Sequence, residues 1–347
     1  MEVLSASDPR WDDRLAGTEH DFYHRRTYHE LAEWNGEGEA FLAVIGGVGN
    51  NAMAWPYVRR PIAGTDLFDV TCVIGYAGPV ATPRQPNSSV HSAWRQLTDV
   101  WAQQRVVSVF SAFHPLIGNE RLAAGVPTGP LGPTPAIVSP GRTVAIDLSR
   151  TPEERMASYE KETRYEIRRA YRRGLEVVVD TGLKHLDDLA RLNDLTMRRN
   201  RAPSRHHFSK AYFERMFELL GGSAQLVVAT HEAEVVCALV VVVDGPFGHA
   251  HITGVSDRHY QLSPLTTTVA AAADLAQDCG ARWLHLGSGR GAREDSLFDF
   301  KRRIGDVLRP YHVGRWVVDS RAYQDLCDVA GAQVLADPPY FPAYRES

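Results

Sequence analysis

Apolar residues recur along this chain at two different spacings, which predict a mixture of helices and strands. Phe22, Leu31 and Trp34 fit the period of a helix, whereas the apolar run 235–243 has the length of a strand. By these criteria helices are expected at residues 21–34, 89–104, 152–173, 186–199, 210–220, 264–279 and 321–329. Strands are expected at residues 1–4, 41–45, 53–59, 69–74, 106–113, 143–148, 177–179, 225–229, 235–243, 249–255, 283–286 and 308–318.

The order of these elements is similar in the two halves of the chain. Each half shows helices, then a meander of antiparallel strands, then a helix and further strands, which predicts an α+β fold. Segment 125–141 is rich in proline and glycine and is typical of a long connection. We therefore place the domain boundary shortly after it, with domains at 1–145 and 146–347. The last helix is free to pack back on the first domain.

The stretch 284–305 combines a short apolar run, a glycine-rich loop and a short helix. Asp295 or Ser296 can cap that helix, and Leu297, Phe300 and Ile304 have the spacing of one buried face. Lys301 lies four residues after Leu297 and joins the same face. A lysine there is costly unless its ammonium reaches solvent, finds a partner or meets a ligand. From the pattern alone, a lysine that extends to solvent is the plainer alternative.

Composition limits the classes of function that remain open. A chain of 347 residues with 44% hydrophobic residues has room for two domains, and a net charge of −4 excludes a polyanion binder that is basic throughout. The four cysteines are far apart, which favours reduced thiols over a disulfide framework or a zinc site. The first residues show no secretion signal, and no apolar run reaches the length of a membrane span. We expect a cytoplasmic protein without a transmembrane segment.

The segment LGSGRGAREDSLFDFKRRIG resembles the LGGG…DSLF-x-FK signature of the Fem family, the tRNA-dependent aminoacyltransferases that build peptidoglycan cross-bridges. The resemblance implies two acyltransferase domains of the GNAT superfamily in tandem, each with a mostly antiparallel mixed sheet flanked by helices. Sustained heptads are absent, so the chain resembles the members without a coiled-coil arm. For the site, the resemblance implies that Lys301 and Phe300 stabilise the oxyanion of acyl transfer. Asp295 and Ser296 would fix the loop that delivers them.

Two basic clusters are candidates for binding phosphates. Arg168 lies in the basic end of the helix expected at 152–173, and Arg199 lies at the end of the helix expected at 186–199. Fem proteins carry a similar basic helix, and a similar Met-x-Arg followed by Tyr-Phe, which adds Tyr212 as a candidate. The alternative for both clusters is a solvated helix end whose charges suit the helix dipole.

Aromatic and histidine residues supply further candidates. Gly-Tyr-Ala-Gly-Pro at 75–79 resembles a Fem segment beside the substrate cleft, so Tyr76 is expected to line the acceptor site. His249 and His251 share one side of a predicted strand, but no third ligand has the right spacing, and we expect no metal site. The remaining histidines considered are expected in loops or on the surface: His20, His24, His29, His206 and His207.

Several common active sites are excluded by spacing. Ser288 does not lie in a Gly-x-Ser-x-Gly elbow, and the glycines at 287–291 do not have the dinucleotide-binding spacing. An acetyl-CoA-dependent GNAT enzyme would show a glycine-rich turn before its main helix, where 260–265 reads YQLSPL. The sequence therefore favours a donor that does not need that pyrophosphate-binding turn.

The function expected from the residues and the resemblance is transfer of an amino acid from charged tRNA, without any other cofactor, to a primary amine or another small nucleophile, forming an amide or an ester. The acceptor is expected to be a peptidoglycan precursor such as a muropeptide, or a small-molecule intermediate of antibiotic biosynthesis. Two alternatives stay open: a coenzyme A- or carrier-dependent N-acyltransferase on the same fold, and a binding module that has lost catalysis.

Overall fold

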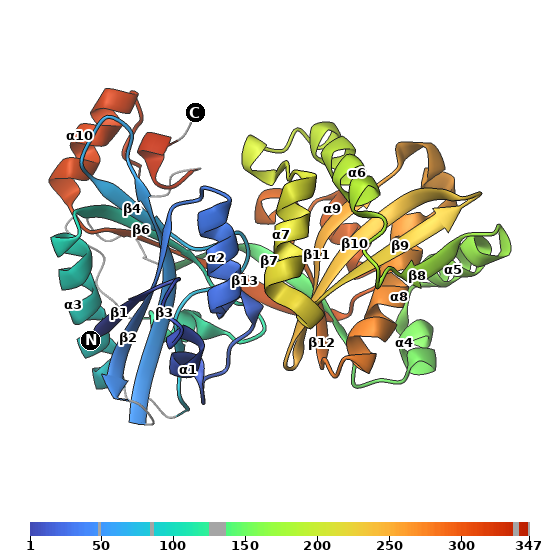
Figure 1. Ribbon diagram of the computed structural model, residues 1–347, viewed down its shortest axis with the longest axis horizontal. Helices are drawn as coiled ribbons and strands as arrows, with labels where there is room; N and C mark the ends of the chain where they lie inside the picture. The colour runs from blue at the N-terminus through green and yellow to red at the C-terminus, as the bar shows by residue number, and fades with distance from the viewer. Residues whose placement is uncertain (48–49, 84–86, 125–136, 336–339, 346–347) are drawn as a thin grey trace. The chain divides into compact units, whose positions relative to one another are not determined.

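The computed structural model describes residues 1–47, 50–83, 87–124, 137–335 and 340–345 (Figure 1). Most of the predicted proline- and glycine-rich connection, residues 125–136, lies outside the described part. The chain forms two compact units, Met1–Pro140 together with Pro310–Ser347, and Gly141–Arg309. The first unit is thus built from both ends of the chain, and the last long helix belongs to it.

The first unit contains a sheet with the strand order β1-β2-β3-β4-β6-β13, in which β5 also pairs with β3. Neighbouring strands are antiparallel except for β4 and β6, which run parallel. The strands are β1 (Glu2–Ser5), β2 (Glu39–Gly47), β3 (Asn50–Pro61), β4 (Phe68–Thr71), β5 (Val80–Ala81), β6 (Val106–Ala112) and β13 (Val307–Val317). The helices are α1 (Trp11–Leu15), η1 (Phe22–His24), α2 (Arg26–Trp34), α3 (Asn87–Gln103), η2 (Asn119–Leu122), α10 (Ser320–Ala330) and η7 (Ala343–Arg345).

The core of the first unit is rich in tryptophan. Trp94 and Trp101 of α3 pack with Trp55 of β3 and Trp316 of β13, and all four side chains are buried. The Trp55 ring lies 5.7 Å from Trp101 in an edge-on arrangement, which aromatic pairs favour. This cluster attaches α3 to one face of the sheet, while α10 packs through Tyr323 and Cys327 in a separate cluster.

The second unit contains a sheet with the order β7-β12-β11-β10-β9-β8. All neighbouring strands are antiparallel except β11 and β12, which are parallel and joined by α8. The strands are β7 (Ile137–Asp147), β8 (Glu176–Val179), β9 (Ala224–His231), β10 (Glu234–Asp244), β11 (Phe247–Val255) and β12 (Trp283–Gly287). The helices are α4 (Pro152–Ser158), α5 (Lys161–Arg172), α6 (Leu186–Arg199), η3 (Ser204–His206), α7 (Lys210–Leu220), η4 (Gly221–Ser223), η5 (Asp257–Leu262), α8 (Pro264–Asp278), η6 (Arg290–Ala292) and α9 (Ser296–Arg302).

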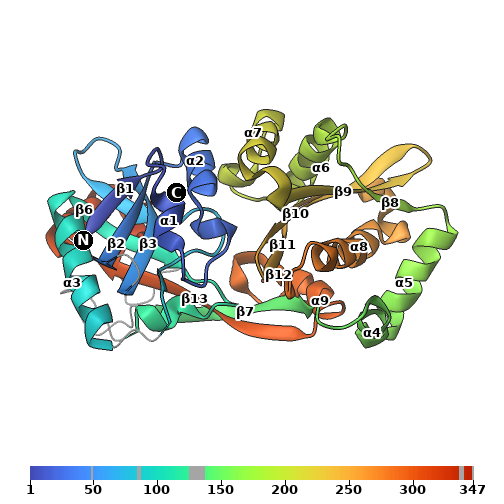
Figure 2. The ribbon, with the colours of Figure 1, turned by 60° about the horizontal axis from the view of Figure 1, so that its bottom comes forward.

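Helices cover both faces of this second sheet. Figure 2 shows α6 and α7 on one face and α8 on the other. Glycines make the close approach possible, because a Cβ at Gly254 would lie 2.6 Å from the Leu192 side chain of α6. On the other face, a Cβ at Gly248 would lie 3.2 Å from Ala276 of α8.

Two predicted helices are each divided in the structure. The helix expected at 152–173 is broken by extended backbone at Tyr159 and Glu160 into α4 and α5. The break lets the apolar ring of Tyr159 enter the core of the second unit, where it is buried. Arg164 then donates hydrogen bonds to the carbonyls of Ala157 and Tyr159 at 2.9 and 2.8 Å, and so satisfies the end of α4.

The helix expected at 21–34 begins instead as the short η1, and Arg25 adopts an extended conformation before α2. The Asp21 side chain caps η1, which competes with continuous helix at this point. The predicted mostly antiparallel α+β fold is confirmed in each unit. Among the described residues, none of the helices has both the length and the apolar composition needed to cross a bilayer.

Candidate functional site

The loop after β12 and the start of α9 hold Lys301 in a defined position. The Lys301 ammonium Nζ donates a hydrogen bond to the backbone carbonyl of Ser288 at 2.6 Å. The Lys301 side chain is half-buried, and its terminal ammonium group makes the hydrogen bond to the loop. A glycine is needed beside that carbonyl, because a Cβ at Gly289 would lie 2.0 Å from the carbonyl oxygen of Arg293.

Asp295 fixes the beginning of α9. Its carboxylate accepts hydrogen bonds from the backbone amides of Leu297 and Phe298 at 3.1 and 3.2 Å, which is the geometry of an N-cap. It also forms an ion pair with Arg290 at 3.0 Å. Burial by itself raises the pKa of the Asp295 carboxyl, but the amide hydrogen bonds and Arg290 outweigh it and the pKa is lowered. The carboxylate therefore stays charged near neutral pH.

Burial also changes the ionisation of Lys301. Loss of hydration lowers the pKa of the ammonium to about 8, and the negative charge of Asp295 only partly opposes this. Lys301 is therefore a cation at neutral pH that loses its proton in mildly alkaline solution. Groups with shifted pKa values of this kind are common at functional sites.

The buried face of α9 differs from the predicted one. Phe298, and not Phe300, is the fully buried residue of the helix, while Leu297 and Phe300 are only half-buried. The helix ends at Arg302, so Ile304 reaches the core from the residues that follow it. Seven residues are too few for the three predicted positions to form one continuous face, and the prediction of that face is wrong. Phe300 instead lies 5.9 Å from the Arg303 guanidinium.

Arg199 is held at the end of α6 by the short helix η5. Its guanidinium forms an ion pair with Asp257 and lies 5.3 Å from the ring of Tyr260. The next residue, Asn200, accepts a hydrogen bond from Arg290 at 3.2 Å. Since Arg290 also binds Asp295, the end of α6 is connected to the start of α9 through side chains.

The other predicted phosphate-binding residue, Arg168, is exposed on α5. Its neighbour Arg169 donates a hydrogen bond to the carbonyl of Gln261 at 2.9 Å, which attaches α5 to η5. The two predicted basic clusters thus meet at one element, η5, which was not among the predicted helices. Ser296 is the exposed first residue of α9.

Tyr212 lies in the core of the second unit. It belongs to α7, is 2% exposed and stacks on Phe208 with 4.2 Å between the ring centroids. The structure therefore does not bring Tyr212 together with Lys301 on an exposed surface.

Tyr76 belongs to the first unit, where the segment 75–79 forms an aromatic corner. Its ring meets Tyr23 and Tyr311 edge-on, at centroid distances of 5.9 and 5.4 Å. Gly75 has φ of +144° and leaves room for Tyr23, whose ring a Cβ would approach to 2.0 Å. Asn119 donates hydrogen bonds to the carbonyls of Ala77 and Pro79 at 2.8 and 2.9 Å, and so fixes the segment.

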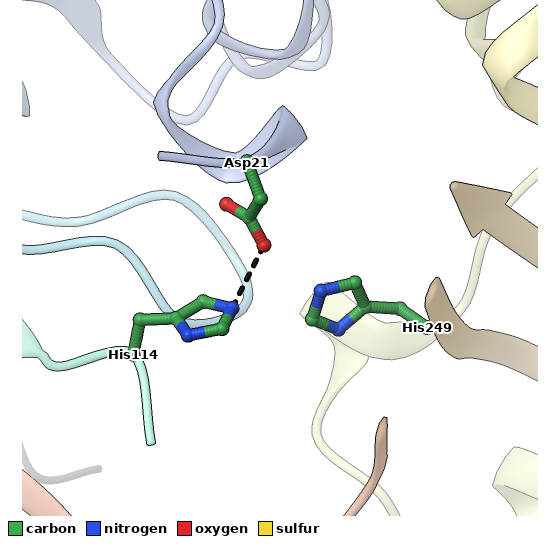
Figure 3. A group of neighbouring side chains, drawn as sticks. All are labelled: Asp21, His114 and His249. Atoms are coloured by element: carbon green, nitrogen blue, oxygen red, sulfur yellow. Dashed lines mark ion pairs between the residues drawn. The ribbon is translucent and has the colours of Figure 1, made fainter. Parts of the chain in front are cut away.

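Buried histidines surround Asp21 in the same unit, which the sequence did not predict. Figure 3 shows the ion pair between Asp21 and His114, whose Nε2 lies 2.8 Å from the carboxylate. His24 contacts the other carboxylate oxygen at 2.9 Å, and all three side chains are fully buried. His29 is also fully buried, and burial lowers its pKa to about 3. The prediction that His24 and His29 lie in loops or on the surface is therefore wrong.

His249, also drawn in Figure 3, belongs to the second unit. It is buried and its ring lies 5.4 Å from that of His285, its partner in the parallel pairing of β11 with β12. The register of β11 against β10 shifts between Ala250 and Ile252, so a bulge occurs at His251. The prediction assumed a regular alternation along β11, which this bulge interrupts.

Comparison with known proteins finds one matching protein family and several solved structures with a similar fold. Residues 157–302 match the family described as "Acetyltransferase (GNAT) domain". None of the curated proteins matches the sequence. The crystal structure of FemX is similar with a TM-score of 0.68 and 12% identity, over 93% of this chain and 99% of FemX.

Two further structures have similar folds at low identity. L-PGS from Bacillus licheniformis has a TM-score of 0.57 and 13% identity, over 92% of this chain and 94% of its own. The C-terminal domain of a protein from Agrobacterium fabrum assigned as a lysylphosphatidylglycerol synthetase has a TM-score of 0.54 and 14% identity, with the same coverage of 92% and 94%. The chain therefore has a fold similar to that of FemX, with an acyltransferase (GNAT) domain at residues 157–302.

Proposed function

We propose that this acyltransferase takes an aminoacyl group from charged tRNA and passes it to a primary amine, forming an amide. One observation carries the proposal: the half-buried Lys301 ammonium is held 2.6 Å from the Ser288 carbonyl, at the start of the loop that resembles the Fem signature. The structural similarity to FemX supports the same fold, and the similar proteins named for lysylphosphatidylglycerol synthesis are consistent with an aminoacyl donor.

For this reaction the protein mainly has to position the two reactants and stabilise the negative charge that forms on the carbonyl oxygen. The amine nitrogen attacks the ester carbonyl, a C–N bond forms, the C–O bond to the ribose breaks, and the proton lost by the amine goes to the ribose hydroxyl. The carbonyl oxygen becomes negative in the tetrahedral intermediate, where a fixed cation is most effective. An ammonium group has three N–H donors, so Lys301 can keep its bond to Ser288 and still offer a donor to the oxyanion.

Other predicted residues have supporting roles in this proposal. Phe300 completes the pair with Lys301, and Asp295 with Ser296 sets the start of the helix that carries them. Arg168 and Arg199 would contact phosphates of the tRNA. Tyr76 would line the acceptor site from the aromatic corner of the first unit. Tyr212 would act indirectly, through the packing of α7.

The acceptor is proposed as an amine of either a peptidoglycan precursor or a small-molecule intermediate of antibiotic biosynthesis. Beyond the tRNA, no cofactor enters the proposed reaction. Variants of Tyr76, in the aromatic corner, test which acceptor is used. They should change which amines in a panel the enzyme prefers.

The test is a transfer assay with total tRNA charged with labelled amino acids and a panel of amine acceptors. We expect labelled amide product that disappears when ribonuclease is added before the enzyme, and that is reduced at least about 100-fold by Lys301→Ala. Lys301→Arg keeps the positive charge and serves as the matched variant. Transfer by Lys301→Ala at the native rate would contradict the role of the lysine.

A coenzyme A- or carrier-dependent N-acyltransferase remains the second candidate, because the matching family is described as an acetyltransferase domain. The start of α8 opposes it: Ser263 has a left-handed conformation, and the first residue, Pro264, has no amide hydrogen to offer a pyrophosphate. The same assay decides, since acetyl-CoA as donor would give a product that ribonuclease does not affect.

A further inference from the structure

Two arginines that meet at η5, Arg169 and Arg199, lie beside exposed tyrosines, and the proposed function has given these tyrosines no role. Tyr165 of α5 is 56% exposed and Tyr260 of η5 is 55% exposed, both unusual for large aromatic side chains. Each has a guanidinium near its ring, Arg169 at 5.7 Å from Tyr165 and Arg199 at 5.3 Å from Tyr260. More than half of each tyrosine is still open to solvent.

These residues form one continuous surface. Arg169 lies one helical turn after Tyr165, and its guanidinium donates to the carbonyl of Gln261, the residue next to Tyr260. Arg199 then reaches Tyr260 from the end of α6. We call these four residues, Tyr165, Arg169, Tyr260 and Arg199, the tyrosine–arginine platform. Its parts come from three separate segments, so local sequence alone does not explain why they meet.

The platform leads to the candidate catalytic helix. Asn200 follows Arg199 and accepts a hydrogen bond from Arg290, which forms an ion pair with the Asp295 cap of α9. Lys301 lies in that helix. The platform is thus linked by side-chain contacts, within one unit, to the start of the helix that carries the group proposed to act on the ester.

From this arrangement we infer that the platform binds the unpaired 3′ end of the donor RNA, with bases stacked on Tyr260 and Tyr165 and the backbone paired with Arg199 and Arg169. The inference rests on the proposed function, because it assigns a subsite to the same donor. Stacking on aromatic side chains combined with arginine contacts to phosphates is how proteins bind single strands without reading sequence. A chain with a net charge of −4 needs such a local surface to bind RNA at all.

A variant of Asp257 should change RNA binding in the opposite direction to a variant of Arg199. The Asp257 carboxylate forms an ion pair with Arg199, whose guanidinium lies 5.3 Å from the centre of the Tyr260 ring, so this negative charge would repel a phosphate bound by Arg199. Removal of this negative charge should strengthen RNA binding, whereas removal of Arg199 should weaken it. A purely structural role for the ion pair predicts that both changes act in the same direction.

The test compares the binding of two uncharged RNA minihelices to the full chain, by fluorescence anisotropy. The two RNAs differ only in whether the 3′ end is unpaired or is paired to a blunt end. We expect Tyr260→Ala to weaken binding of the RNA with the unpaired end about 5- to 150-fold and to leave the blunt RNA nearly unchanged. Tyr260→Phe should bind like the native chain, because the ring remains.

Tyr171→Ala is the matched control. Tyr171 is an exposed tyrosine of the same helix as Tyr165, at 49% exposure, but six residues further on and therefore on another face. We expect this variant to bind both RNAs as the native chain does. Equal weakening of both RNAs by Tyr260→Ala, or none, would overturn the platform even if transfer depends on tRNA. Absence of binding of either RNA to the native chain would overturn the proposed donor as well.

Discussion

At the scale of single residues, the proposed catalysis depends on where the Lys301 ammonium group lies. Lys301 could be selected from the sequence because it occurs in a stretch that resembles the Fem signature and at an awkward position in an apolar helix. The carbonyl that holds it could not, since backbone groups carry no sequence signal and the bond to Ser288 spans a loop. Phe298 was missed as the buried anchor for a different reason: the buried face of this short helix is rotated from the face that the apolar spacing predicts.

The pKa of Lys301 predicts how activity depends on pH. The protonated side chain stabilises the oxyanion, so the rate of transfer should fall as pH rises through about 8, the pKa of the folded protein. Lys301→Arg should remove this fall, because a guanidinium stays charged throughout that range. Single-turnover rates with a saturating acceptor between pH 6 and about 9 measure the effect. A fall that persists unchanged in the arginine variant would assign the titration to another group.

Burial of Lys301 should also cost stability. Its folded pKa of about 8 lies below the ordinary lysine value of 10.5, so the native state binds the proton less tightly than the unfolded chain does. The penalty is complete below pH 8 and is relieved as pH rises from 8 towards 10.5. We expect Lys301→Met to be more stable at pH 7 by about 1–2 kcal/mol in urea unfolding, with the difference shrinking above pH 8. A methionine variant that is less stable at both pH values would contradict a penalty of this origin.

At the scale of elements, the loop and the cap of α9 decide whether Lys301 is delivered. Asp295→Ala removes the acceptor for the amides of Leu297 and Phe298. We expect it to lower the free energy of unfolding by about 0.5–2 kcal/mol and to reduce transfer, with Kd for the RNA little changed. Thermal unfolding and transfer rates are the two measurements.

Asp319→Ala is the control for the loss of a cap. Asp319 caps α10 of the first unit by accepting from Ala322 at 3.0 Å, so it offers the same chemistry in a helix without candidate catalytic residues. A similar loss of stability with normal transfer is expected. If both variants lose transfer equally, the effect of Asp295→Ala is general destabilisation and not delivery of Lys301.

Element boundaries show where the sequence is informative. The helices α6 and α7 occur at their predicted residues, because long amphipathic segments with clear ends determine them. The segment 152–173 has the same helical pattern, yet Tyr159 breaks it by entering the core, a tertiary effect that periodicity does not contain. The sequence indicates only a turn without glycines at 260–265, whereas the structure has η5 at Asp257–Leu262. The role of η5 as the meeting point of two basic clusters depends on packing between segments far apart in the chain.

At the scale of the whole molecule, the net charge of −4 restricts how RNA can bind. Attraction must come from a local set of arginines, so binding should weaken steeply with salt, with a slope set by the number of phosphates contacted. Arg168→Ala should reduce the magnitude of the slope of log K against log[salt] by about 0.7–0.9, the contribution of one phosphate contact. Salt titrations of minihelix binding measure it. An unchanged slope would place Arg168 outside the RNA contact.

The central claim is that Lys301 promotes transfer from an aminoacyl ester of RNA to an amine. The most direct measurement is the single-turnover rate of amide formation from a charged minihelix, at saturating enzyme and acceptor, for the native chain, Lys301→Arg and Lys301→Ala. We expect product from the native chain, partial activity of the arginine variant, and a rate at least about 100-fold lower for the alanine variant at unchanged RNA affinity. A native rate for Lys301→Ala, or no product from the native chain with any charged RNA, would contradict the central claim.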